Sequence, residues 1–131
     1  MKLSGHGLEC DFEFAEPDME GWMQTSIRVQ VPAFEGGFGC TIQIEEWEEF
    51  IRVLRQLEAS IGTDTRAEWA NMEGNVAFRF ELHRSGALEM QYKFSAQTLA
   101  SGPTLSGICE ADQSFLPEWV RASQQALEDV R

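Results

Sequence analysis

The sequence predicts an α+β fold: a largely antiparallel, curved meander sheet of about seven strands in the order βββαββββα, with two helices packed on the sheet. Three observations predict it. Apolar and polar residues alternate in several short segments, which is the period of a strand with one solvated face. Two longer segments, residues 45–60 and 115–131, repeat apolar residues at helical spacing instead. Short turn-forming segments separate the alternating ones, as they do in antiparallel hairpins.

The length predicts one domain that covers residues 1–131. A chain of 131 residues, of which 43% are hydrophobic, is large enough to bury a core of its own. No linker, internal repeat or low-complexity stretch interrupts it. The many Phe and Trp residues also exclude a disordered acidic tail.

The first alternating segments predict a meander of three strands. They cover residues 8–14, 23–31 and 38–44. Pro32 ends the second strand because it has no amide hydrogen to donate to a neighbouring strand. The glycine-rich segment "FEGGFG", residues 34–39, is interpreted as the turn that precedes the third strand.

The segment "EEWEEFIRVLRQLEAS", residues 45–60, is the clearest helix. Its apolar residues form one stripe, made of Trp47, Phe50, Ile51, Leu54 and Leu57. Four carboxylates crowd its first turns, where the helix dipole favours negative charge: Glu45, Glu46, Glu48 and Glu49. This cluster has two interpretations, a contact site or an ordinary solvated helix face, and the second is the commoner role of such charge runs.

The second half of the chain predicts four more strands and a helix. Residues 66–72 form a weak strand, and residues 76–82 and 88–94 form a hairpin closed by "HRSG". Residues 104–111 form a last short strand, in which a glycine suits a bulge or a close backbone approach. A loop is expected at residues 96–103.

The stretch "EADQSFLPEW", residues 110–119, could hold a reactive acid beside a hydroxyl or could simply begin a helix. Asp112 and Ser114 are typical helix caps, and Pro117 falls in the first turn, where proline loses no hydrogen bond. The sequence therefore predicts that Asp112 and Ser114 form a structural helix cap.

The charge of the chain is strongly negative and unevenly distributed. The net charge is −12, and residues 1–50 hold 11 of the 22 acidic residues but only Lys2 and Arg28 among the bases. Such a surface disfavours nucleic acid and anionic lipid, so we expect neither as a partner. It favours a cationic protein partner, although excess acid can also serve solubility alone.

No metal, cofactor or disulfide is expected from the cysteines and histidines. Cys10, Cys40 and Cys109 lie far apart without a CxxC pair, and His6 and His83 are isolated in sequence. Because the chain also shows no N-terminal signal segment and no membrane-spanning apolar run, we expect a cytoplasmic location.

No constellation of residues predicts catalysis. Ser114 has no histidine near it in sequence, and the glycine clusters do not match a phosphate-binding loop. Acidic pairs on strands are better explained as solvated faces than as acid–base pairs. We therefore expect a protein that is not an enzyme, with no catalytic residue. Trp22 and Trp69 remain candidates for pocket aromatics.

Four segments resemble the WapI-type family of small bacterial proteins, some of which are immunity proteins for secreted toxins. They are "IRVQVPAFEG", "WEEFIRVLRQL", "FRFELHRSGALEMQYKF" and "DQSFLPEW", and their order and spacing carry the resemblance over nearly the whole chain. The resemblance implies neutralisation of a toxin by direct binding, and it transfers no catalytic residue.

Two functional hypotheses follow. The first is an immunity-type protein that binds a cationic toxin domain, often a nuclease, through an acidic surface made of Asp18, Glu20, Glu45, Glu46, Glu48 and Glu49. The alternative is a small-ligand-binding or other interaction module whose cavity is lined by Trp22 or Trp69. A filled core would count against the ligand pocket.

Overall fold

The computed structural model describes all 131 residues, with its elements in the order ββββαββββα. The first four strands form one antiparallel sheet in chain order: β1 (Lys2–Gly5), β2 (Leu8–Phe14), β3 (Trp22–Val31) and β4 (Phe34–Gln43). The next four form a second: β5 (Thr65–Ala70), β6 (Val76–Leu82), β7 (Ala87–Gln97) and β8 (Ser101–Asp112). The helices are α1 (Ile44–Ala59) and α2 (Leu116–Glu128), the latter preceded by a short 3₁₀ turn, Gln113–Phe115.

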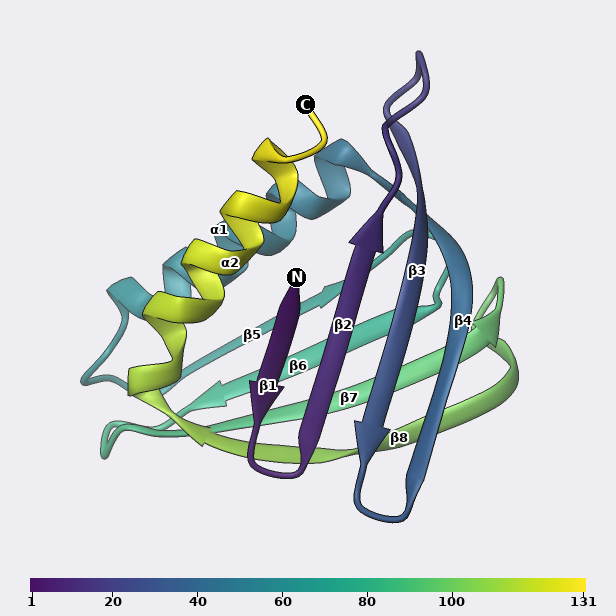
Figure 1. Ribbon diagram of the computed structural model, residues 1–131. Helices are drawn as coiled ribbons and strands as arrows, with labels where there is room; N and C mark the ends of the chain where they lie inside the picture. The colour runs from purple at the N-terminus through teal and green to yellow at the C-terminus, as the bar shows by residue number, and fades with distance from the viewer.

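The α+β class and the antiparallel pairing are confirmed, but the expectation of one sheet of about seven strands is wrong. Helix α1 separates β4 from β5, and these strands do not pair, so the chain forms two four-stranded sheets. Figure 1 shows the strands of the two sheets crossing at a large angle, with α1 and α2 side by side along one side. Each sheet buries one face against the other. Its strands therefore alternate apolar and polar residues, just as the strands of a single sheet covered by helices would.

Three local expectations are also corrected. The loop expected at residues 96–103 is only three residues long, 98–100, because β7 continues to Gln97 and β8 begins at Ser101. Strand β1 was not predicted, and it is a four-residue strand whose one fully buried side chain is Leu3. The segment 34–39, expected to be a turn, belongs to β4, and the turn consists of Pro32 and Ala33, since Val31 pairs directly with Phe34. Ala33 adopts a φ of 71°, which with Pro32 before it matches a type II turn, where proline is common at the second position and the third has positive φ.

The predicted helices and the central hairpin are confirmed. The apolar stripe of α1 is buried, and β6 pairs with β7 from Val76 opposite Phe94 to Leu82 opposite Leu88. Neither helix is both long and apolar enough to cross a membrane.

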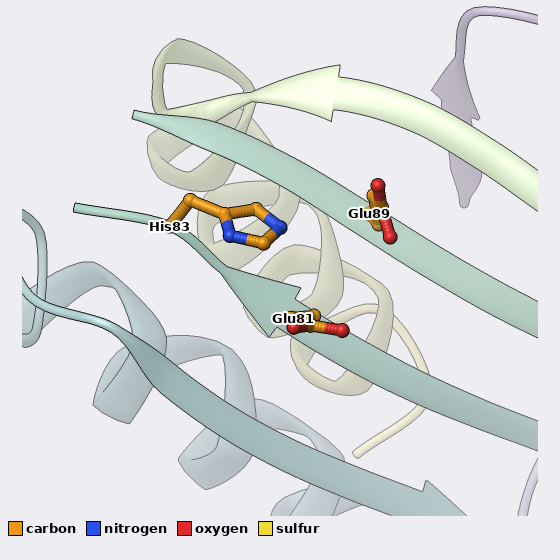
Figure 2. A group of neighbouring side chains, drawn as sticks. All are labelled: Glu81, His83 and Glu89. Atoms are coloured by element: carbon orange, nitrogen blue, oxygen red, sulfur yellow. The ribbon is translucent and has the colours of Figure 1, made fainter. Parts of the chain in front are cut away.

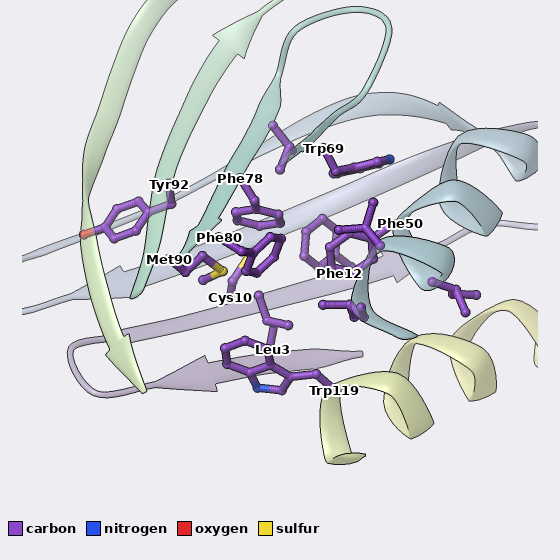
Figure 3. Packing of buried hydrophobic residues seen from close by; sticks show 14 of the residues in the cluster. Leu3, Cys10, Phe12, Phe50, Trp69, Phe78, Phe80, Met90, Tyr92 and Trp119 are labelled. Atoms are coloured by element: carbon purple, nitrogen blue, oxygen red, sulfur yellow. The ribbon is translucent and has the colours of Figure 1, made fainter. Parts of the chain in front are cut away.

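The core fills the space between the sheets and the helices. Twenty-nine buried apolar residues form one cluster. Its centre is aromatic: the ring centroids of Trp47 and Phe50 are 4.7 Å apart, and those of Phe50 and Trp69 are 4.9 Å apart. Figure 3 shows Phe50 of α1, Phe12 of β2 and Phe78 of β6 converging there, so both sheets and α1 contribute to a single core.

Two tryptophan side chains fix the helices to their neighbours. The indole nitrogen of Trp47 donates to the carbonyl of Ser123, at 3.0 Å, and joins α1 to α2. Trp119 donates to the carbonyl of Ser4, at 3.1 Å, and joins α2 to β1. Each buried indole N–H thus has a partner, which burial requires.

Candidate interaction surface

The two acidic groups named by the sequence lie together at one end of the molecule. The loop between β2 and β3 rests on the start of α1: the amide of Ile44 donates to the carbonyl of Gly21, at 2.9 Å, and the side chain of Gln43 to the carbonyl of Glu20, at 3.4 Å. Figure 1 shows this loop projecting beside the first turn of α1. We call this surface the acidic end and define it by five residues: Asp18, Glu20, Glu45, Glu48 and Glu49.

The loop of the acidic end has an ordered backbone. One carboxylate oxygen of Asp18 accepts from the amides of Glu20, at 2.9 Å, and Trp22, at 3.0 Å. Gly21 has a φ of 86°, which a side chain would disfavour. Met19, held between the two acids at the tip, is fully exposed. The loop therefore presents an apolar side chain flanked by negative charge.

Glu46 has a different role from the other glutamates of α1. One of its carboxylate oxygens accepts from the amide of Gln43, at 2.8 Å, and the other accepts from the amide of Met72. The bond to Gln43 is part of a capping box at the helix start, and the bond to Met72 ties the helix start to the segment that follows β5. Glu46 was expected as a partner-binding residue, but both of its oxygens are used within the fold.

The remaining helix glutamates are available to a partner. Glu45 is exposed and forms no ion pair. Glu48 lies 3.3 Å from Arg131, and Glu49 lies 2.7 Å from Arg52. Exposed ion pairs of this kind contribute little to stability, about 0–1 kcal/mol, so a cationic partner can displace them at small cost.

The two candidate pocket aromatics do not line a ligand cavity. Trp69 is only 5% exposed and packs within the aromatic centre of the core. Trp22 is half-buried at the start of β3, beside the Asp18 turn. Neither borders a principal hollow of the surface.

One apolar hollow lies along β4, and it was not predicted from the sequence. Its volume is about 340 Å³, and its apolar lining includes Phe34, Phe38, Phe94, Pro103 and Leu105. Phe34 is 67% exposed. In the sequence, the only indication of this hollow was an aromatic residue within the glycine-rich segment 34–39. The hollow has few polar groups, whereas a specific ligand site needs several that converge.

Asp112 and Ser114 meet at the start of the 3₁₀ turn. The carboxylate of Asp112 accepts from the backbone amide of Ser114, at 2.8 Å, and from its hydroxyl. These hydrogen bonds, first that of the hydroxyl and then that of the amide, lower the pKa of Asp112 below its ordinary value because they stabilise the charged form. Helix α2 itself begins two residues later, at Leu116, with Pro117 in its first turn.

The three thiols are free and buried. Burial raises the pKa of Cys40 to about 12, and the neighbouring charges of Glu73 and Glu46 act in the same direction. The pKa values of Cys10 and Cys109 are raised as well, mainly by burial. Such thiols carry almost no thiolate near neutral pH and are poor nucleophiles.

One mixed group of side chains has the composition of a metal site. Glu81, His83 and Glu89 bring their ligand atoms within 4.8 Å of one another, and all three are half-buried. No metal site was predicted here, because His83 is isolated from the other histidine and the thiols lack ligand spacing. The signal was available in the hairpin "ELHRSGALE", where a four-residue turn brings the two glutamates opposite each other.

The comparisons agree with the resemblance seen in the sequence. No curated protein matches the chain. The model of the immunity protein WapI-like family matches residues 2–130, which is almost the whole length. The chain belongs to the WapI-like immunity protein family.

Proposed function

We propose that this protein is a non-enzymatic immunity protein that binds a cognate secreted toxin domain in the cytoplasm and neutralises it through the acidic end. Membership of the WapI-like family supports an immunity role in general. The choice of surface rests on one observation: the fold brings the loop acids, Asp18 and Glu20, beside the acids at the start of α1.

Charge favours a cationic toxin, such as a nuclease with a basic substrate-binding surface. The net charge of −12 attracts such a domain from a distance, and a local concentration of carboxylates orients it. Charged rims of this kind raise the association rate more than they slow dissociation. The exposed Met19 adds apolar contact area between Asp18 and Glu20.

The structure also bears on the alternative, a small-ligand-binding module. Trp69 is used in the core, and its indole N–H is bonded to the carbonyl of Glu46. In the aromatic centre of the core the rings of Trp47, Phe50 and Trp69 pack against one another. This arrangement favours recognition at the surface.

The test measures binding to the toxin domain encoded beside this protein. The variant E20K/E45K/E49K reverses three charges of the acidic end and leaves Asp18, which holds the loop backbone, in place; the control E9K/E35K/E68K reverses three exposed charges on the outer faces of the sheets. We expect the first variant to lower the association rate by about tenfold or more at low salt, and the control to change it much less. Equal effects of the two variants would remove the acidic end from the interface.

A further inference from the structure

The outer face of the second sheet carries a row of carboxylates that the immunity role does not use. Glu81 of β6 lies directly opposite Glu89 of β7, and Glu89 lies directly opposite Glu110 of β8. Side chains of directly opposed residues project from the same face at close spacing, and like charges in these positions destabilise a sheet. The one basic side chain paired with the row is Arg66, 3.5 Å from Glu81 and 83% exposed.

A histidine adds a different kind of ligand to this row. His83 follows Glu81 by two residues, so its side chain lies on the same face of the sheet. Figure 2 shows its imidazole ring directed toward the space between β6 and β7, near Glu89. The ligand atoms of Glu81, His83 and Glu89 lie within 4.8 Å of one another. A nitrogen ligand beside two carboxylates distinguishes this group from an ordinary patch of acidic residues.

The backbone around the histidine is fixed from three directions. The amide of Gly86 donates to the carbonyl of His83, at 2.8 Å, and closes the turn. The amide of Arg84 donates to the carboxylate of Asp64, at 2.8 Å, and the amide of Gln113 donates to the carbonyl of Gly86, at 2.8 Å. The ligands are therefore carried by two paired strands and a braced turn, and rigid elements of this kind preorganise a metal site.

We propose that Glu81, His83 and Glu89 bind one divalent transition-metal ion, with Zn²⁺ as the best match. Two carboxylate oxygens and one imidazole nitrogen form a ligand set that suits zinc, whereas Mg²⁺ and Ca²⁺ prefer oxygen alone. The two glutamate charges offset the charge of the ion. The ion in turn removes the repulsion between Glu81 and Glu89, and Glu110 adds negative potential beside it.

The metal site is separate from the acidic end. Figure 1 places the β6–β7 turn and the β2–β3 loop at opposite ends of the molecule. The buried thiols do not compete for the ion, because a thiol must lose its proton to bind zinc and burial raises the pKa of each one. Zinc binding at this site therefore does not depend on the immunity role.

The first experiment is calorimetric titration of the metal-free full chain with zinc chloride. We expect the native protein to bind one equivalent, and H83A and E89Q to lose about tenfold or more in affinity, since even the loss of a second-sphere partner costs about 10–100-fold. His6 is the only other histidine and is exposed, so H6A is the matched control and should bind as the native protein does. R66Q removes the basic neighbour of Glu81 and should bind more tightly.

A second measurement needs no variant. In the native protein, zinc should shift the imidazole NMR signals of His83 and leave those of His6 unchanged. Circular dichroism establishes that H83A is folded before its affinity is compared. The proposal is overturned if the native chain binds no zinc at millimolar concentration, if H83A binds as tightly as H6A, or if zinc leaves the His83 signals in place.

Discussion

The indole nitrogen of Trp69 donates a hydrogen bond to the backbone carbonyl of Glu46, 2.8 Å away. The bond joins β5 of the second sheet to the first turn of α1, where the acidic end begins. The side chain of Glu46 adds bonds to the amides of Gln43 and Met72. The first turn of α1 is thus hydrogen-bonded to the end of β4 and to the second sheet. Glu45, Glu48 and Glu49 therefore project from a rigid element. A rigid surface binds with less loss of entropy than a mobile one.

Removal of the Trp69 indole should therefore destabilise the fold. Trp69→Ala should lower the free energy of unfolding by about 3–5 kcal/mol, through loss of packing in the aromatic centre. Trp69→Phe keeps much of the packing but removes the indole donor to the carbonyl of Glu46, and it should cost about 0.5–1.5 kcal/mol. Urea denaturation measures both. Trp22→Phe, at a half-buried position, is the control, and a loss as large as that of Trp69→Phe would contradict this account.

Glu46 and Glu45 are neighbours with opposite expected effects. Glu46→Ala removes the capping-box bond to Gln43 and the bond to Met72, and it should lower stability by about 0.5–2 kcal/mol. Glu45→Ala removes an exposed carboxylate without an ion pair and should leave stability nearly unchanged while weakening toxin binding. Denaturation and binding measured on the same two proteins separate the roles; a stable Glu46→Ala protein would show that the capping box contributes nothing.

The pH dependence of stability should carry a contribution from Asp112. Its folded pKa lies below the ordinary value of 3.8 because Ser114 donates two hydrogen bonds to the charged form. The stabilisation is therefore complete above the unfolded pKa and is lost as pH falls through the lower folded pKa. Asp112→Asn should be less stable than the native protein at neutral pH, and the difference should shrink in strong acid. Thermal melts across this range measure it, and a difference independent of pH would contradict the assignment.

The elements were predictable from sequence because their patterns are local. The stripe of Trp47, Phe50 and Leu54 defines α1, and the alternation on either side of Gly86 defines the β6–β7 hairpin. The number of sheets was not predictable in this way. Alternation reports which side chains face inward, but it does not report which strands pair, and two facing sheets bury the same residues as one curved sheet.

The local errors have similar causes. Strand β1 has one fully buried side chain, Leu3, which is too little for a periodic signal. The glycines at positions 36, 37 and 39 suggested a turn, yet β3 pairs with them residue by residue. For the candidate site, the sequence named the acids but not their proximity, because the contact between Glu20 and Gln43 spans 23 residues. The pairing of Glu81 with Glu89 follows from the register of a hairpin, which its turn determines.

The cysteines should be inert until the protein unfolds. Burial raises the pKa of Cys40 to about 12 and raises the pKa values of Cys10 and Cys109 as well. In a thiol-exchange assay with a coloured disulfide at about pH 8, native protein should react at the rate of its unfolding, whereas protein in denaturant should release three thiols at once. Rapid reaction of any thiol in the native protein would show that it is more accessible than the structure indicates.

Gly107 of β8 provides a test of the close packing on the second sheet. It pairs directly with Tyr92 of β7, whose ring covers it, and a β-carbon at position 107 would overlap the phenol group. Gly107→Ala should therefore displace the buried Tyr92 ring and lower the free energy of unfolding by about 1–3 kcal/mol, as overpacking does. A β-carbon added to Gly36 of β4 would have no neighbour within 4 Å, so Gly36→Ala should be neutral or stabilise by about 0.4–1 kcal/mol. Urea denaturation distinguishes the two, and equal stability of the variants would mean that the ring moves aside without cost.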